Sequence, residues 1–398
     1  MKKILAIVLG MSSLSMAQTA DVVTLGAGYA NESYYSFENG EVASEQIDSW
    51  DLAFDLDAFG AAVRLNNKRS SLWVYPGVVG DWTTVDTNGM ATTWETALND
   101  YESWSLGALN VVGDPMSATD LGWGEYNTIT HQIQGSRIFV LELSNGTFRK
   151  LLIESLAGGD YSIKFDLLDN SNEVVEVISK SSYVGKNFVY YNILTESITD
   201  REPLSSDWDV VFTNYVLELA PGYISSVTGV LQNSSVEVSK VESQPVSTST
   251  YATFEPEINT IGYDWKSFNM SLFTYEIVAD LSYFVKLEND DVWKVVFTGF
   301  EGSSTGVVNF TKEKVESAGV PEYMGATVDV YPNPASNILN ISSVYSINSL
   351  SIVNASGQVV YTGVESMINV SNFDEGFYFM HIKDDAGNVS VEKIIIKH

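Results

Sequence analysis

The residues able to carry out chemistry are few in this chain of 398 residues. It has no cysteine and three histidines, His131, His381 and His398. The lack of cysteine removes disulfides, thiolate metal sites and cysteine nucleophiles together. Three histidines far apart in the sequence are also too few to favour a nucleophile–histidine dyad or a metal site with several histidines. These enzyme classes are therefore disfavoured.

Carboxylates are plentiful, with 51 acidic against 21 basic side chains and a formal charge of −30. A glycosidase needs only two of them, so a carboxylate-based hydrolase stays open as an alternative. The oxygen-rich stretch 166–173 lacks the spacing of a known calcium loop, and we interpret it as a solvated turn. Exposed tryptophans could stack on sugars, which keeps open a surface carbohydrate-binding or adhesive protein. The candidates are Trp82, Trp94, Trp104 and Trp123.

The negative charge argues against two classes of partner. A polyanion is repelled by phosphate backbones and by anionic lipid head groups, so no nucleic-acid or membrane-surface role is expected. No segment reaches the roughly 20 apolar residues of a transmembrane helix, so no transmembrane segment is expected either. An apolar fraction of 45% with 12% aromatic residues predicts folded domains.

The first 17 residues have the layout of a secretory signal peptide. Lys2 and Lys3 precede a short apolar run, 4–9, and small residues at Ser15 and Ala17 suit signal peptidase. Residues 1–17 are therefore predicted to be removed on export, leaving a mature protein that begins at Gln18.

The elements that must position any site are predicted to be strands. Alternation of apolar and polar residues, as in 137–143 and 161–165, is typical of half-buried strands. Helical stripes are scarce, and the best is short, at 92–101. The fold class is therefore all-β.

Two long segments of the chain repeat the same landmarks in the same order. An aromatic pair, Tyr34-Tyr35, precedes a Trp-Asp segment at 48–54, and Tyr190-Tyr191 precedes another at 206–212. Three further pairs of landmarks follow in the same order: Trp123 and Asn127 with Trp265 and Asn269, Phe139-Val140 with Phe284-Val285, and Lys150 with Lys294. Residues 18–185 and 186–326 are therefore predicted to be two copies of one β domain.

Residues 327–398 form a third unit, with turn signals at the spacing of a small Ig-like β-sandwich. Four segments, 330–335, 357–360, 375–378 and 392–397, resemble the type A C-terminal sorting domain of the Bacteroidetes type IX secretion system. The residues that carry this motif are Tyr331, Pro332, Asn333, Pro334, Gly376, Tyr378, Lys393 and Lys397. The family pattern usually ends at the terminal lysine, whereas His398 follows in this sequence. The resemblance implies export by the type IX secretion machinery and a secreted or outer-membrane surface location.

The two repeats resemble the HmuY-like family of secreted haem-binding proteins. The resemblance rests on a Trp-Asp-x-x-Phe strand after an aromatic pair, a Phe-Val strand and an aromatic-Lys strand. It implies two tandem HmuY-like β domains and haem as a cofactor. In that family the iron ligands lie in loops between the Trp-Asp and Phe-Val strands.

The family position of the iron ligands falls on Met90, Met116 and His131 in the first copy and on Met270 alone in the second. Methionine and histidine are common axial ligands of haem iron. The plainer interpretation makes the two methionines loop or gap-filling residues and His131 a strand residue that faces water. A basic cluster of Arg64, Lys68 and Arg69 could offset the repulsion of haem propionates, or could be a solvated strand end.

The Trp-Asp pairs at 50–51 and 208–209 are interpreted as core tryptophans with locally hydrogen-bonded carboxylates. Taken together, these observations favour a non-enzymatic binding protein, secreted or displayed at the cell surface. The expected ligand is haem or another planar apolar molecule, with glycan binding and carboxylate-based hydrolysis as the alternatives.

Overall fold

The computed structural model describes residues 18–315, 328–343, 346–354, 358–385 and 389–398. The chain divides into two compact units, Met1–Glu316 and Ser317–His398. The expected signal peptide, 1–17, lies outside the described residues. The described residues are mostly strands, which confirms the all-β prediction.

The described residues of the first unit form four larger antiparallel sheets and one hairpin. One sheet has the strand order β14 (Ser197–Thr199)-β13 (Phe188–Asn192)-β4 (Leu52–Asp55)-β5 (Val63–Leu65). A second sheet has the strand order β12 (Val174–Ser179)-β11 (Asp160–Leu167)-β10 (Phe148–Ala157)-β8 (Gln132–Gly135)-β7 (Gly124–Asn127). In the latter, β9 (Phe139–Glu142) pairs with β10 and with β6 (Ser71–Val74). The other sheets are β16 (Tyr223–Gln232)-β15 (Val210–Ala220)-β2 (Asn31–Ser36)-β3 (Gly40–Gln46) and β1 (Thr19–Thr24)-β22 (Val307–Val315)-β21 (Val292–Phe300)-β20 (Leu281–Lys286)-β17 (Glu237–Glu242). The hairpin is β18 (Lys266–Asn269)-β19 (Thr274–Ile277).

Helices in the described residues are short. The α-helix α1 (Met90–Thr93) is one turn long, and the 3-10 turns are η1 (Ala27–Tyr29), η2 (Val79–Thr84), η3 (Lys180–Tyr183), η4 (Ser205–Asp207) and η5 (Gly302–Ser304). The helix expected over 92–101 is wrong beyond Thr93, because Trp94 already has extended backbone. Its indole Nε1 donates to the carbonyl oxygen of Asn88 at 3.0 Å.

The two largest hydrophobic clusters among the described residues of the first unit divide it into lobes. One cluster draws on Leu52 to Ile193 and the other on Val23 to Phe37 together with Val210 to Phe310. We call residues 48–204 the first lobe, and residues 19–47 with 205–315 the second lobe. The lobes therefore do not coincide with the sequence copies 18–185 and 186–326.

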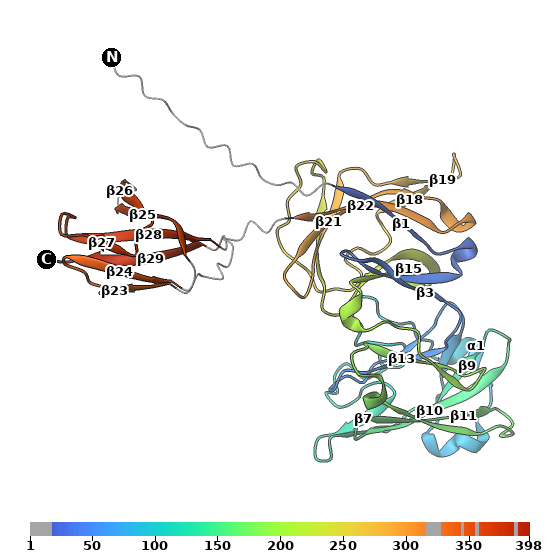
Figure 1. The fold of residues 1–398 in the computed structure, drawn as a ribbon. Coiled ribbons are helices and arrows are strands. Elements are labelled where there is room, and N and C mark those ends of the chain that lie inside the picture. Colours follow the sequence, from blue (N-terminus) through green and yellow to red (C-terminus); the bar gives the residue numbers. More distant parts are fainter. Residues whose placement is uncertain (1–17, 316–327, 344–345, 355–357, 386–388) are drawn as a thin grey trace. The chain divides into compact units, whose positions relative to one another are not determined.

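The difference arises because strands pair across the boundary expected between the two copies. The strand of Tyr34-Tyr35, β2, pairs with β15, which follows Trp208-Asp209 in the other copy. Reciprocally, the strand of Tyr190-Tyr191, β13, pairs with β4, which follows Trp50-Asp51. Figure 1 shows the consequence, with the blue strands β1 and β3 lying among yellow and orange strands of the second lobe.

Each junction of exchanged strands is closed by the aspartate of a Trp-Asp pair. Asp51 accepts a hydrogen bond from the Ile193 amide at 2.8 Å, and Asp209 accepts one from the Phe37 amide at 2.6 Å. The tryptophans of the two Trp-Asp pairs make equivalent contacts as well. Trp50 meets the Tyr190 ring edge-on at 5.1 Å, and Trp208 meets the Tyr34 ring edge-on at 5.1 Å. The repeated landmarks thus occupy equivalent positions in the two lobes.

The later landmarks repeat as a hairpin. Asn127 closes the turn between β7 and β8 by accepting hydrogen bonds from the amides of Ile129 and Thr130. Asn269 closes the turn between β18 and β19 in the same way, through the amides two and three residues ahead. The two hairpins therefore have one turn chemistry, set by an asparagine at the same place in each copy.

In the second unit, the residues that the structure describes form two antiparallel sheets around one cluster of buried apolar residues. They are β23 (Val328–Tyr331)-β24 (Ile338–Ser343)-β27 (Met367–Asn369) and β26 (Val359–Gly363)-β25 (Ile347–Asn354)-β28 (Gly376–Asp384)-β29 (Val389–Ile396). Both sheets supply residues to this cluster, Leu339 from β24 and Ile352 from β25, which is the packing of a small β-sandwich.

Candidate functional site

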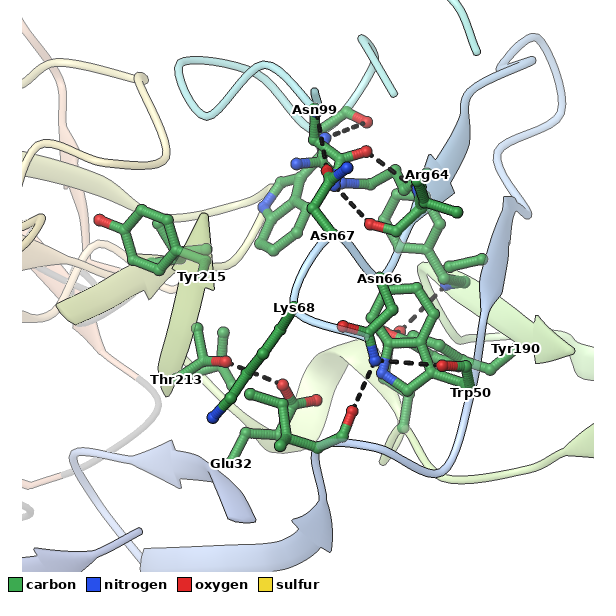
Figure 2. Close-up of a pocket in the computed structure, with 18 of the residues that line it drawn as sticks. Glu32, Trp50, Arg64, Asn66, Asn67, Lys68, Asn99, Tyr190, Thr213 and Tyr215 are labelled. Carbon is green, nitrogen blue, oxygen red and sulfur yellow. Dashed lines mark hydrogen bonds between the residues drawn. The ribbon is translucent and has the colours of Figure 1, made fainter. Parts of the chain in front are cut away.

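A cavity of about 70 Å³ lies where the two lobes meet (Figure 2). Its apolar walls are aromatic and come from both lobes: Trp50, Trp104, Trp208, Tyr34, Tyr190 and Tyr215. The Tyr34 and Tyr190 hydroxyls meet at 3.3 Å, which joins the exchanged strands β2 and β13 at the cavity. We call this space the inner cavity. About 10–15 Å³ suffices for one water molecule, so the space holds several waters or a small chemical group.

Three polar atoms around the inner cavity have no protein partner. They are the indole Nε1 atoms of Trp50 and Trp208 and the hydroxyl of Tyr215. The Trp208 and Tyr215 side chains are 3% and 4% exposed. Buried donors of this kind nearly always have a partner, so water or a ligand group is needed beside them.

Arg64 is buried in the wall of the inner cavity, although it makes no ion pair with any described residue. Its guanidinium donates to carbonyl oxygens, among them those of Asp100 at 2.8 Å and Ser103 at 3.0 Å. It also stacks over the rings of Tyr101 and Trp104, at 5.2 and 5.0 Å from their centroids. Burial lowers the pKa of Arg64 from its usual value. The cavity wall therefore contains a positive charge with no ion-pair partner among the described residues, although the nearby charge of Asp100 acts in its favour.

Two glutamates with different surroundings also line the inner cavity. Glu32 forms an ion pair with Arg201 at 2.6 Å and accepts from the Thr213 hydroxyl at 2.9 Å. Glu202 has no such cation and accepts from the Asn187 amide at 3.0 Å and the Tyr190 hydroxyl at 3.0 Å. Burial raises the pKa of Glu202 from 4.5 to about 7, although these hydrogen bonds oppose the rise.

The raised pKa of Glu202 predicts that the free energy of unfolding of the first unit depends on pH. The favourable contribution of Glu202 is fully present below about pH 4.5 and is lost as the pH rises to about 7, because the ionised form is disfavoured in the fold. The expected loss is about 3 kcal/mol. It is measured as the difference in unfolding free energy between the native protein and Glu202→Gln at pH 4 and pH 8. Parallel pH profiles for the two proteins would contradict the assignment.

A second cavity, of about 430 Å³, adjoins the first. Lys68 and Asn214 line both spaces, so the two form one site. We call the larger space the outer cavity. Its remaining walls include the rings of Tyr29, Tyr275 and Phe300 and the ammonium-bearing side chain of Lys266.

The basic cluster that the sequence indicated is split by the fold. Arg64 lines the inner cavity, Lys68 lines both cavities, and Arg69 forms an ion pair with Asp51 at 3.2 Å. Two of the three residues thus belong to the site. Lys266 and the three unpartnered polar atoms gave no signal in the sequence, because a lone lysine or tryptophan does not reveal its neighbours.

The proposed haem ligands lie in different surroundings. Met90 is buried in a cluster with Trp82, Val85 and Trp94. Met116 is 91% exposed on a turn, and His131 is exposed at the β7–β8 turn, where Nδ1 meets the Tyr126 hydroxyl at 2.7 Å. None of the three lines the inner or outer cavity. The structure thus does not bring them together around either space.

The other residues considered from the sequence are mostly structural. Trp82, Trp94 and Trp123 are buried, whereas Trp104 lines the inner cavity. Within 166–173, Asp166 accepts from the Asn172 amide at 2.8 Å, as in a self-bonded turn. No group of three or more histidine, aspartate or glutamate side chains suited to a metal is present among the residues that the structure describes.

In the second unit, the sorting-motif residues fasten the segment after β23 to the last strand. The Asn333 side chain donates to the Lys393 carbonyl oxygen at 2.8 Å and accepts from the Ile395 amide at 2.8 Å. Ala335 extends this contact as an isolated parallel bridge to Ile396. The Tyr378 hydroxyl donates to the carbonyl oxygen of Asp374 at 2.8 Å. Tyr331 is exposed before Pro332 and Pro334, Gly376 begins β28, and Lys397 donates its amide to the Ala335 carbonyl oxygen at 2.9 Å.

Comparison with known proteins identifies the second unit. Residues 329–397 match the family described as the secretion system C-terminal sorting domain. The chain is accordingly exported by the type IX secretion system and is secreted or located at the outer-membrane surface. No curated protein matches the chain. None of the helices in the described ranges has the length and apolarity needed to cross a bilayer.

Proposed function

We propose that the first unit is a non-enzymatic binding module that holds a small molecule in the joined inner and outer cavities. One observation carries this proposal: Arg64, Lys68 and Lys266 line the two adjoining cavities, and none of them forms an ion pair with a described residue. In a protein of net charge −30, cations that lie next to aromatic walls and make no ion pair with a described residue favour a ligand-binding site.

The size of the outer cavity supports a small-molecule ligand. Its volume of about 430 Å³ falls within the range of roughly 300–1,000 Å³ that is usual for such sites. The aromatic walls suit a planar ligand. Haem remains one prediction, as does the HmuY-like assignment of the repeats. Among the residues that line the two cavities, tyrosine is the side chain that commonly ligates haem iron.

A blocking variant tests the location of the site. Ser303 is an exposed residue of η5 that lines the outer cavity, and its neighbour Ser304 is exposed and does not line it. The full-length protein is titrated with three probes: haemin, the aromatic sulfonate 8-anilinonaphthalene-1-sulfonate, and the neutral N-phenyl-1-naphthylamine. We expect at least one probe to bind saturably. Its affinity is expected to be about tenfold or more weaker for Ser303→Trp and unchanged for Ser304→Trp. Equal binding by both variants, or no binding of any probe, would overturn the proposal.

A carboxylate-based hydrolase is the second candidate, and it rests on Glu32 and Glu202 lining the same cavity. A carboxyl with a raised pKa beside an ionised one is the arrangement that glycosidases use. The opposing observation is that hydrogen bonds from neighbouring groups already occupy both glutamates. Turnover of aryl glycosides that falls at least a hundredfold in Glu202→Gln would favour this candidate over simple binding.

A further inference from the structure

The ammonium group of Lys266 is enclosed by carbonyl oxygens and aromatic rings. It donates to the carbonyl oxygens of Thr228 at 2.5 Å and Tyr263 at 3.3 Å. It also lies 3.9 Å from the centroid of the Trp265 ring and 4.6 Å from that of Phe300. An ammonium group has three N–H donors, so these two hydrogen bonds leave one for a ligand.

A second ammonium group reaches the outer cavity from the other lobe. Lys68 donates to the Tyr29 carbonyl oxygen at 3.0 Å and lies 5.9 Å from the centroid of the Tyr29 ring. Lys68 and Lys266 thus line one cavity from opposite lobes. Neither contributes to an ion pair within the described part of the chain, where most other lysines do.

The wall between these cations is flat and aromatic. The rings of Tyr29 and Phe300 are nearly parallel, with their centroids 6.1 Å apart and 9° between their planes. Tyr275 meets Phe300 edge-on at 4.7 Å. Such a surface favours a ligand with a ring or another flat face, since aromatic side chains pack well against π-faces.

We propose that the outer cavity binds a small organic anion with a ring-shaped or flat body, whose carboxylate, sulfate or phosphate group is held by Lys68 and Lys266. The aromatic body rests against Tyr29, Tyr275 and Phe300. This inference rests on the proposed function and specifies the chemistry of its ligand. The bond to each lysine is charge-assisted, which makes it stronger than a hydrogen bond between neutral groups.

The surroundings of Lys266 predict that the affinity of the outer cavity for an anion depends on pH. Burial lowers its pKa to about 7, opposed by the charge of Asp264, which itself pairs with Lys240 at 2.7 Å. Burial also lowers the pKa of Lys68, opposed by Asp48 and Glu32. The remaining titratable groups at the outer cavity are the hydroxyls of Tyr29, Tyr263 and Tyr275, and burial raises the pKa of Tyr29 to about 12. The anion needs protonated Lys266, so its affinity is expected to fall as the pH rises above about 7.

The test compares the anionic and neutral naphthyl probes, with fluorescence as the readout. The full-length protein is titrated with 8-anilinonaphthalene-1-sulfonate and with N-phenyl-1-naphthylamine at pH 6 and pH 8.5. The variants are Lys266→Met, Lys68→Met and the control Lys294→Met. Lys294 also bonds a carbonyl oxygen, lies near the Phe284 ring and makes no ion pair with a described residue, but it lines neither cavity.

We expect the sulfonate to bind about tenfold or more weakly to Lys266→Met and to Lys68→Met, and equally to the control and the native protein. The native protein is expected to lose about tenfold or more of its sulfonate affinity between pH 6 and pH 8.5, and Lys266→Met is expected to lose much less. If Lys266→Met fails to fold, the sulfonate affinity of Lys68→Met tests the proposal instead, because Lys68 is exposed and its replacement does not disturb the core.

The inference is overturned if the sulfonate binds equally to the lysine variants and the native protein. If the neutral probe nevertheless binds the native protein and Ser303→Trp blocks that binding, the proposed binding site stands and only its preference for anions is overturned. If neither probe binds the native protein, the proposed function itself fails, and the inference fails with it.

Discussion

Replacement of Asp51 by alanine is expected to lower the free energy of unfolding of the first unit by about 3–5 kcal/mol. The Asp51 carboxylate is fully buried, where it pairs with Arg69 at 3.2 Å and accepts from the Ser70 hydroxyl at 3.0 Å and the Ile193 amide at 2.8 Å. Its removal leaves a cation and an amide without partners at the junction of the exchanged strands β4 and β13.

Urea unfolding followed by tryptophan fluorescence measures this loss. All nine tryptophans lie in the first unit, so the signal does not include the sorting domain. Asp209→Ala is the matched comparison, because Asp209 closes the equivalent junction but is only half-buried. We expect it to cost about 1–3 kcal/mol. A loss below about 1 kcal/mol in Asp51→Ala would mean that the junction does not depend on its aspartate.

Replacement of Arg201 by methionine is expected to cost about 3–5 kcal/mol, because it leaves Glu32 as an unpaired buried charge. The Arg201 guanidinium is fully buried and pairs with Glu32 at 2.6 Å, and it also donates to the carbonyl oxygen of Gln46 at 2.9 Å. Urea unfolding followed by tryptophan fluorescence again provides the measurement.

A double variant separates the loss of the ion pair from the loss of packing. Glu32→Gln combined with Arg201→Met removes both charges, and it is expected to recover about half of the stability lost in Arg201→Met. A double variant less stable than Arg201→Met would show that the polar contacts of Glu32 with Tyr34 and Thr213 matter more than its charge.

The strands and the repeated landmarks could be predicted from the sequence, because alternation and residue order are local properties of the chain. The sequence predicts a structural role for the Trp-Asp pairs, and the hydrogen bonds of Asp51 and Asp209 agree with that prediction. The tryptophans of the same pairs also line the inner cavity, which the sequence did not indicate. A residue can serve the fold on one face and a site on the other.

The exchange of β2 and β13 between copies could not be predicted, because alternation fixes which face of a strand is buried but not which strand pairs with it. For the same reason the sequence does not indicate which residues line the two cavities. The family resemblance places the iron ligands at Met90, Met116 and His131, none of which lines either cavity, and the cavities form where the exchanged strands meet. Of the sequence candidates, Lys68 alone lines both cavities.

A crystal structure of the full-length protein soaked with 8-anilinonaphthalene-1-sulfonate would locate the ligand. We expect density for the probe in the outer cavity, with the sulfonate within hydrogen-bonding distance of Lys68 and Lys266 and a ring against Tyr29 or Phe300. Probe bound elsewhere, with only water in the two cavities, would contradict the claim that the junction of the repeats is the binding site.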